Sequence, residues 1–300
     1  MRLLLSALLG ALIPTFAQAA DSCELQRLAE LPVVYSEDGI PLIHADAAGH
    51  GLTLAIRIDQ VYSNIKANAA KALGLERHRL QENEPQIQYG NEDIKYTTRI
   101  PQLALGHAVL LKPEFLEIAA EHPDESKYDG FLGINDLRQF DLELDLGNNL
   151  IRLFSPNHCP GRVAYWAGEY GKLTLTQNPL HLPYVKLTLD GHDLLAVVST
   201  SHAFTSMPKA LAAKFHASPE PSSKCSKPPN AWPSFTELDI DSVVLSHPQI
   251  DTSCEHPICE DAWFQTPELA LGLNHLRKLR LYFAFGDGTL YILPSGAASH

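Results

Sequence analysis

The sequence predicts a mainly β fold with short helices, built from two tandem copies of one domain. Its 300 residues are enough for two domains of roughly 100–150 residues each. Twenty-one prolines and few long apolar heptads favour short elements and many turns, which is typical of β-rich structure. An internal repeat is the third observation, and it indicates two copies independently of composition.

The clearest repeat relates residues 131–147, FLGINDLRQFDLELDLG, to residues 270–286, ALGLNHLRKLRLYFAFG. The second segment begins 139 residues after the first (270 minus 131), and no gap is needed. A Leu-Gly pair ending in Gly133 or Gly272 recurs, as do an Asn, a Leu-Arg pair and a closing Gly. Each copy is therefore predicted to contain a Leu-Gly segment, a helical turn and a final hairpin.

A fainter repeat relates residues 49–73 to residues 191–215, with an offset of 142 (191 minus 49). Each segment predicts a hairpin, a strand, a loop and a short helix at 67–73 or 209–215, and Asp190-Gly191 is the clearest turn signal. The change of offset from 142 to 139 indicates a three-residue indel, as a surface loop would tolerate.

The beginning of the chain has the features of an export signal. Met1-Arg2 is followed by an apolar stretch at 3–13 that is too short to span a bilayer, and Ala17-Gln18-Ala19 offers a cleavage site. Residues 1–19 are therefore predicted to be a signal peptide, with the two copies at 24–160 and 161–300. We expect an exported protein, periplasmic or secreted, without a membrane span.

An oxidising compartment favours disulfides between cysteines. The chain has five, Cys23, Cys159, Cys225, Cys254 and Cys259. Cys23 and Cys159 could tie together the ends of the first copy, and two of the other three could pair. The spacing of His247, Cys254, His256 and Cys259 matches no strong zinc pattern, so we expect no metal and no cofactor.

The formal net charge of −12 disfavours a nucleic-acid or anionic-membrane partner, which would need clustered Lys and Arg. The simplest interpretation of this negative charge is that it keeps the protein soluble. We expect a monomer that binds no nucleic acid.

The order of elements resembles the retropepsin-like and pepsin-like aspartic proteases. In that family an apolar-apolar-Gly segment passes behind the catalytic loop, and residues 131–133 and 270–272 look like that segment. The run from Asp136 to Asp145 is typical of bacterial members. The resemblance implies two β-barrel lobes related by a pseudo-twofold axis. It also implies two aspartates, one per lobe, about 3 Å apart and sharing a proton.

Both catalytic motifs are degenerate when placed on this pattern. The second copy has Ser199 and Thr200 where the family has Asp-Thr, and the ungapped repeat places Arg57 at the Asp position of the first copy. Asp59 then stands at the Gly position, as a loop residue that could pair with Arg57. A serine hydroxyl lacks the basicity to activate water alone, and a cation cannot act as a base.

Three functions compete on this basis. The leading hypothesis is an inactive protein that binds a peptide or protein between its lobes. The alternative slides the register by two, which makes Asp59 the catalytic acid of a divergent aspartic endopeptidase, as a dimer if a second carboxylate is needed. The third is a structural envelope role without a ligand. Ser199 with His202 as nucleophile and base is disfavoured, since the sequence shows no orienting carboxylate.

Overall fold

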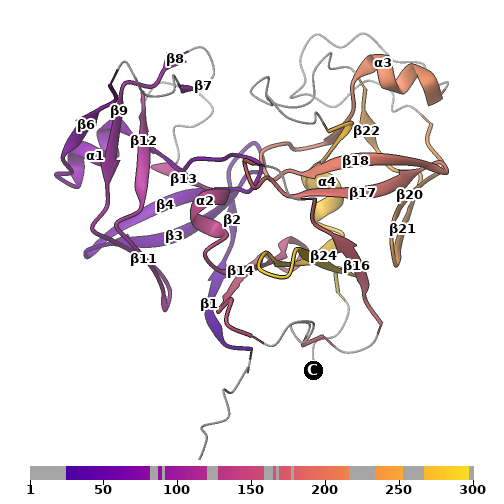
Figure 1. Cartoon of the computed structure of the whole chain (residues 1–300), viewed down its shortest axis with the longest axis horizontal. Coiled ribbons are helices and arrows are strands. Elements are labelled where there is room, and N and C mark those ends of the chain that lie inside the picture. The colour runs from indigo at the N-terminus through magenta and orange to yellow at the C-terminus, as the bar shows by residue number, and fades with distance from the viewer. Residues whose placement is uncertain are drawn as a thin grey trace, which may run out of the picture.

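The computed structural model describes residues 25–81, 87–89, 92–119, 128–158, 165–166, 169–176, 179–215, 234–252 and 267–296. Strands dominate these residues, so the expectation of a mainly β protein is confirmed. Two bodies lie side by side and share a sheet below them (Figure 1). We call residues 25–158 the N-terminal half and residues 165–296 the C-terminal half. The proposed signal peptide and all five cysteines lie outside the described residues.

The N-terminal half is built around one large sheet. Its strands are β2 (Val34–Tyr35), β3 (Pro41–Ala47), β4 (His50–Arg57), β5 (Asn64–Lys66), β6 (Arg77–Arg79), β9 (Tyr96–Arg99), β10 (Gln102–Leu105), β11 (Ala108–Leu111), β12 (Glu114–Ile118) and β13 (Gly130–Gly133). They lie in the order β11-β10-β3-β4-β13-β5-β12-β9-β6, and β2 pairs with β3. Two short helices, α1 (Ala67–Ala72) and α2 (Ile134–Leu137), follow β5 and β13. A separate two-stranded sheet joins β7 (Gln88–Tyr89) and β8 (Glu92–Asp93).

The C-terminal half repeats this arrangement. Its strands are β17 (Tyr184–Leu189), β18 (His192–Val198), β19 (Thr205–Ser206), β20 (Glu237–Ile240), β21 (Val243–Ser246), β22 (Ile250–Asp251) and β23 (Leu269–Leu271), with helices α3 (Lys209–Ala212) and α4 (Leu273–Leu276). The order β21-β20-β17-β18-β23-β19-β22 corresponds strand for strand to β11-β10-β3-β4-β13-β5-β12. The hairpins predicted at 49–50 and at Asp190-Gly191 are present, and both predicted helices form.

The structure also contains a third repeated block, which sequence analysis missed. The β10–β11 hairpin at 102–111 corresponds to the β20–β21 hairpin at 237–246, with an offset of 135 (237 minus 102). The turn residues Gly106 and Asp241 both have positive φ, 63° and 59°. Only Leu103, Val109 and Leu110 recur as identical residues in this block. The duplication therefore also includes a hairpin that lies between the two segments that repeat in the sequence.

The halves are joined by a six-stranded sheet. Its strands are β1 (Arg27–Pro32), β14 (Asp141–Asp145), β15 (Leu150–Phe154), β16 (Gly171–Thr174), β24 (Leu279–Ala284) and β25 (Thr289–Pro294). They lie in the order β1-β15-β14-β24-β25-β16. At its centre Leu142 pairs with Phe283 and Leu144 with Leu281. Since positions 142 and 281 correspond in the repeat, as do 144 and 283, exchanging the halves maps this pairing onto itself.

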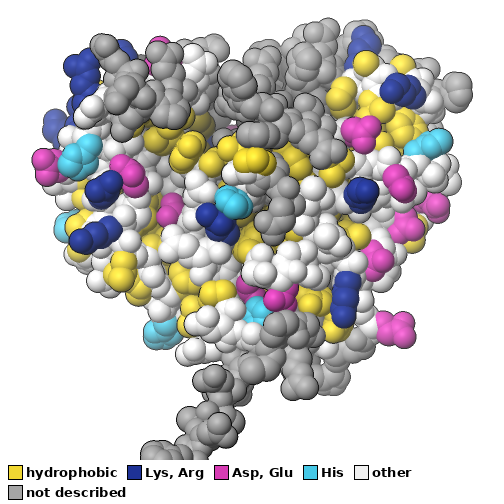
Figure 2. Space-filling model, in the orientation of Figure 1, with side chains coloured by type: hydrophobic (Ala, Val, Ile, Leu, Met, Phe, Trp, Pro, Cys, Tyr) yellow, Lys and Arg dark blue, Asp and Glu magenta, His cyan; other side chains and the backbone are white. Residues whose placement is uncertain are grey.

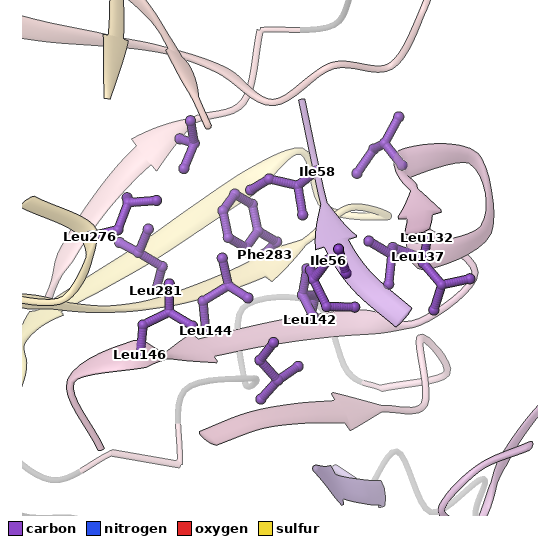
Figure 3. Close-up of a cluster of buried hydrophobic side chains, with 14 of the residues drawn as sticks. Ile56, Ile58, Leu132, Leu137, Leu142, Leu144, Leu146, Leu276, Leu281 and Phe283 are labelled. Atoms are coloured by element: carbon purple, nitrogen blue, oxygen red, sulfur yellow. The ribbon is translucent and has the colours of Figure 1, made fainter. Parts of the chain in front are cut away.

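One face of the shared sheet is apolar and supports the loops above it. Side chains alternate between the faces of a strand, so Leu142 and Leu144 of β14 point to the same side. Figure 3 shows them near Phe283, Ile56 and Ile58; Ile56 lies at the end of β4, and Ile58 directly follows that strand. All five side chains are almost completely buried. This core fixes the position of the backbone at the end of β4 relative to the shared sheet.

The opposite face is ionic and aromatic. Glu143, completely buried at the centre of β14, accepts hydrogen bonds from Arg152 at 2.6 Å and from two nitrogens of Arg280 at 3.0 and 3.1 Å. The Tyr165 hydroxyl and the Trp166 indole nitrogen also donate to it, at 3.2 and 3.0 Å. A buried carboxylate is tolerated only when its charge and its oxygens are satisfied in this way.

Substituting Glu143→Gln is therefore expected to lower the free energy of unfolding by on the order of 3 kcal/mol, because among the described ion pairs it leaves the buried Arg280 with only the Asp145 carboxylate, 3.9 Å away. Urea unfolding monitored by far-UV circular dichroism measures this loss. The matched control is Glu114→Gln, whose partner Arg99 lies 3.5 Å away with both side chains about half exposed. That pair is worth roughly 1 kcal/mol or less. Equal losses in the two variants would contradict the assigned role of Glu143.

Candidate functional site

The candidate site lies where the loops that follow β4 and β18 meet. In each half the Leu-Gly segment runs parallel to the strand that delivers the loop, pairing Leu132 with Ile56 and Leu271 with Val198. These pairs reproduce the sequence offsets of 142 and 139. Arg57 and Ser199 therefore occupy the same place in the two copies.

Thr200 connects the two loops through its side chain. Its hydroxyl donates to the Ile56 carbonyl at 2.6 Å and accepts from the Ile58 backbone N–H at 3.1 Å, and the residue is completely buried. The corresponding residue of the N-terminal half is Ile58, whose side chain has no hydroxyl and packs into the core of Figure 3. This hydroxyl bridge to the backbone of the other loop is therefore made by Thr200 and has no counterpart at Ile58.

The side chain that reaches across to Ser199 is that of Asp59. One carboxylate oxygen accepts from the Ser199 hydroxyl at 2.6 Å, and the other accepts from the Ser201 hydroxyl at 2.9 Å. Nδ1 of His202 lies 2.7 Å from the Ser199 hydroxyl and 3.7 Å from the carboxylate. The Asp59 side chain is only 6% exposed. We call these four residues the junction site.

Arg57 points elsewhere, so the expectation that it could pair with Asp59 is wrong. Its guanidinium donates to the hydroxyls of Tyr89 and Tyr128, both at 2.8 Å, and lies 4.7 Å from the centre of the Phe131 ring. Hydroxyl acceptors and an aromatic face are both favourable neighbours for a planar cation. Asp59 instead finds hydroxyl donors in the other half. The backbone register holds, but the residue two positions later supplies the carboxylate.

The electrostatics of the junction site favour an ionised Asp59. Burial alone would raise the pKa of this carboxyl, but hydrogen bonding and charge from His202, with hydrogen bonds from Ser199 and Ser201, outweigh burial and lower the pKa. An ionised carboxylate only accepts, so the Ser199 hydroxyl donates to it and His202 Nδ1–H donates to Ser199. A nucleophilic serine needs the opposite direction, with histidine accepting its proton.

A second buried hydroxyl lies behind each loop, which sequence analysis did not identify. Ser63 accepts from the Gly133 N–H at 3.0 Å and donates to Asp136. In the C-terminal half Thr205 accepts from the Gly272 N–H at 2.9 Å and lies 2.7 Å from His275 Nδ1. The signal was present, because Ser63 and Thr205 are related by the 142 offset, and Asp136 and His275 by the 139 offset.

The pKa values of Asp136 and His275 are shifted in opposite directions. Burial raises the pKa of Asp136, and the hydrogen bond from Ser63 offsets this only in part. Burial and the charge of Lys278 lower the pKa of His275 to about 4. Both shifts disfavour the charged form relative to the same side chain in water.

Gly133 and Gly272 lie where the Leu-Gly segments pass the loop backbone. A Cβ on Gly133 would lie 2.6 Å from the Tyr62 carbonyl, and one on Gly272 would lie 2.4 Å from that of Phe204. Both contacts are with backbone, which cannot rotate away. Only glycine fits at these positions without moving a loop of the site.

The variant Gly272→Ala is expected to lower the free energy of unfolding by about 1–3 kcal/mol, because the methyl group forces the loop at Phe204 outward. Thermal and urea unfolding measure the change. A suitable control is Gly286→Ala, since a Cβ there meets no atom within 4 Å. The steric explanation fails if Gly286→Ala costs as much as Gly272→Ala.

His275 is also expected to make the protein less stable in acid. The unfolded histidine binds a proton near pH 6.5 and the folded one only near pH 4, so the free energy of unfolding falls as the pH falls between these values. The loss is on the order of 3 kcal/mol. Urea unfolding of wild type and His275→Gln across this range measures it.

The difference between the two pH profiles isolates His275 from other groups. Asp141, whose pKa burial raises to about 6, gives the opposite slope in both proteins and cancels. A difference that does not change between pH 4 and 6.5 would contradict the assigned shift of His275.

Other features of the described residues offer little chemistry at the junction. No group of three His, Cys, Asp or Glu side chains in the described ranges could hold a metal. Two cavities of about 440 Å³ lie beside Arg77 in the N-terminal half, away from Asp59.

On the face in Figure 2, basic side chains are interspersed with acidic ones. Among the described helices, none has the length and apolar character needed to cross a bilayer.

Comparison of the chain with models of protein families and with curated protein sequences finds no match.

Proposed function

We propose that this chain is a two-lobed, aspartic-protease-like protein that does not cleave peptides and instead binds an extended peptide or protein segment at the junction of its halves. One observation carries the proposal. The junction site holds a single carboxylate, Asp59, whose two oxygens are already occupied by Ser199 and Ser201. Aspartic proteolysis needs two carboxylates that share a proton, and Ser199 occupies the place of the second.

Three features support the acid-protease-like architecture. The two halves have corresponding strand orders, a six-stranded sheet built from both halves lies beneath them, and the β4 and β18 loops meet above that sheet. In each half the Leu-Gly segment passes directly behind the loop. These features support the two-lobed architecture that the resemblance to retropepsin-like and pepsin-like proteases leads us to propose.

The surface near the junction suits an extended apolar peptide. Tyr62, three residues after Asp59, is 45% exposed, although the next residue, Ser63, is buried. Apolar side chains form a band across the middle of the face in Figure 2, where the halves meet. Exposed aromatic side chains are frequent anchors in binding interfaces. We therefore place Tyr62 in the binding surface.

The test uses the purified protein and a fluorescein-labelled, reduced and carboxymethylated protein as an unfolded probe. We expect binding by fluorescence anisotropy without cleavage between about pH 3 and pH 7, a range that spans the ionisation of catalytic carboxyl groups. Tyr62→Ala is expected to weaken binding about fivefold or more. Val244→Ala, which removes a side chain of 52% exposure on the outer strand β21, is the matched control.

Two results would overturn the proposal: cleavage of the probe that pepstatin blocks, or an absence of binding in the wild-type protein. An affinity that falls equally in Tyr62→Ala and Val244→Ala would remove the junction as the binding surface.

A divergent aspartic endopeptidase is the second candidate, and the 2.6 Å contact between Asp59 and Ser199 favours it. That contact places a carboxylate at the centre of the junction, where a catalytic group would act. Asp59→Asn would then abolish any cleavage, whereas Asp38→Asn, an exposed aspartate of the same half, would leave it unchanged. A second carboxylate would have to come from another molecule, so activity would depend on dimerisation.

Export belongs to the same proposal. Residues 1–19 motivate a periplasmic or secreted location, and a structural role in the envelope remains the alternative if no unfolded or folded protein binds at the junction. Fractionation of cells producing the full chain, with N-terminal sequencing of the mature protein, tests the location and the cleavage site.

A further inference from the structure

The repeated Leu-Arg pair gives each half an arginine directly after its helical turn, Arg138 after α2 and Arg277 after α4. Arg277 is held by the other half. Its guanidinium donates to the Gly39 carbonyl at 3.0 Å and lies 4.1 Å from the centre of the Tyr35 ring. The repeat predicts an equivalent contact from Arg138 to the C-terminal half.

The segment that Arg138 should meet is residues 175–183, which corresponds to residues 33–41. Val33 N–H donates to the Asn149 carbonyl at 2.8 Å, and Leu175 N–H donates to the Gly288 carbonyl at 2.9 Å. Asn149 and Gly288 are themselves related by the 139 offset. The two segments therefore have the same place in the fold.

Within this correspondence, His181 stands at the position of Gly39. Both have positive φ, 58° and 80°, so the turn is the same. A Cβ on Gly39 would lie 3.3 Å from the nearest guanidinium nitrogen of Arg277, so a side chain at this position crowds an arginine that approaches the carbonyl. At the position that corresponds to Tyr35 the sequence has Gln177, which lies outside the described residues.

Arg138 therefore does not make the contact that Arg277 makes. Its side chain is exposed, and within the described ranges it makes no hydrogen bond or ion pair. It lines a cavity of about 110 Å³ whose other walls are Leu175, Thr176, His181, Leu182, Pro183 and Phe285. No carboxylate is among these described lining residues. The cavity lies between the halves, because Arg138 belongs to one and the remaining walls to the other.

We propose that this cavity is a binding site for a small oxyanion, a carboxylate or phosphate group, held by the Arg138 guanidinium with Thr176 and His181 beside it. A guanidinium presents paired donors that match such oxygens, and apolar walls strengthen a charge-assisted hydrogen bond by excluding water. A volume of about 110 Å³ accommodates one such group but not a large ligand. The net charge of −12 disfavours non-specific anion binding, so any affinity must come from a defined site.

The site is tested by titrating the purified protein with inorganic phosphate and, separately, with acetate, while the imidazole signals of His181 are followed by NMR. Binding of either anion with a shift at His181 is expected, and the tighter of the two identifies phosphate or carboxylate as the group. Arg138→Gln is expected to weaken binding about tenfold or more.

The matched control is Arg99→Gln, which neutralises an exposed arginine lining a cavity that also contains Arg77 and Arg79. It is expected to leave the affinity unchanged. His181→Gly restores the residue found at Gly39, so it is expected to let Arg138 approach the carbonyl and to weaken anion binding without loss of folding. The His181→Gly variant therefore tests the proposal even if Arg138→Gln folds poorly.

The proposal is overturned if wild type binds neither anion, or if Arg138→Gln binds as tightly as wild type. Weakening in Arg99→Gln rather than in Arg138→Gln would transfer the binding to the other basic cavity and equally overturn it. None of these outcomes bears on peptide binding at the junction site.

Discussion

The antiparallel pairing of β14 with β24 is the contact on which the remaining architecture depends. It is the point where the two halves share backbone hydrogen bonds, with Leu142 opposite Phe283 and Leu144 opposite Leu281. A strand has two faces, so this one pairing must satisfy two environments at once. The apolar row supports the loops of the junction site, and the Glu143 row on the reverse side carries buried charge.

Glu143 shows why the reverse face tolerates that charge. Arg152 comes from the N-terminal half and Arg280 from the C-terminal half, so the carboxylate has both of its guanidinium partners only when both halves are in place. Removing one partner of such a network is costly, whereas the complete network is tolerated. The network thereby favours one relative placement of the halves over others. That placement also determines how the loops that carry Asp59 and Ser199 lie relative to each other.

The two halves have the same residue at positions where the backbone packs closely, and different residues at several positions where a polar side chain makes hydrogen bonds. Gly133 and Gly272 recur because a Cβ would strike the backbone of a loop. By contrast, Asp136 in one half corresponds to His275 in the other, and Arg138 faces His181 where Arg277 contacts Gly39. Packing constrains the first kind of position in both copies alike. Side chains at the second kind can diverge, because each has only to be satisfied in its own surroundings.

The sequence by itself determined the duplication, the Leu-Gly segments and the backbone register that sets Arg57 level with Ser199. Those features depend on local spacing, and the offsets of 139 and 142 record them directly. The correspondence of the hairpin at 102–111 with the hairpin at 237–246 could not be predicted from the sequence, because the two share the geometry of the turn but few identical residues.

Only the tertiary structure decided where the side chains at the junction point. Asp59 turns toward hydroxyl donors about 140 positions away in the chain, and Arg57 turns toward Tyr89 and Tyr128. No local pattern encodes that choice, because it depends on which half supplies donors for a carboxylate and which supplies acceptors for a cation. Those partners meet only after β14 and β24 have brought the halves together.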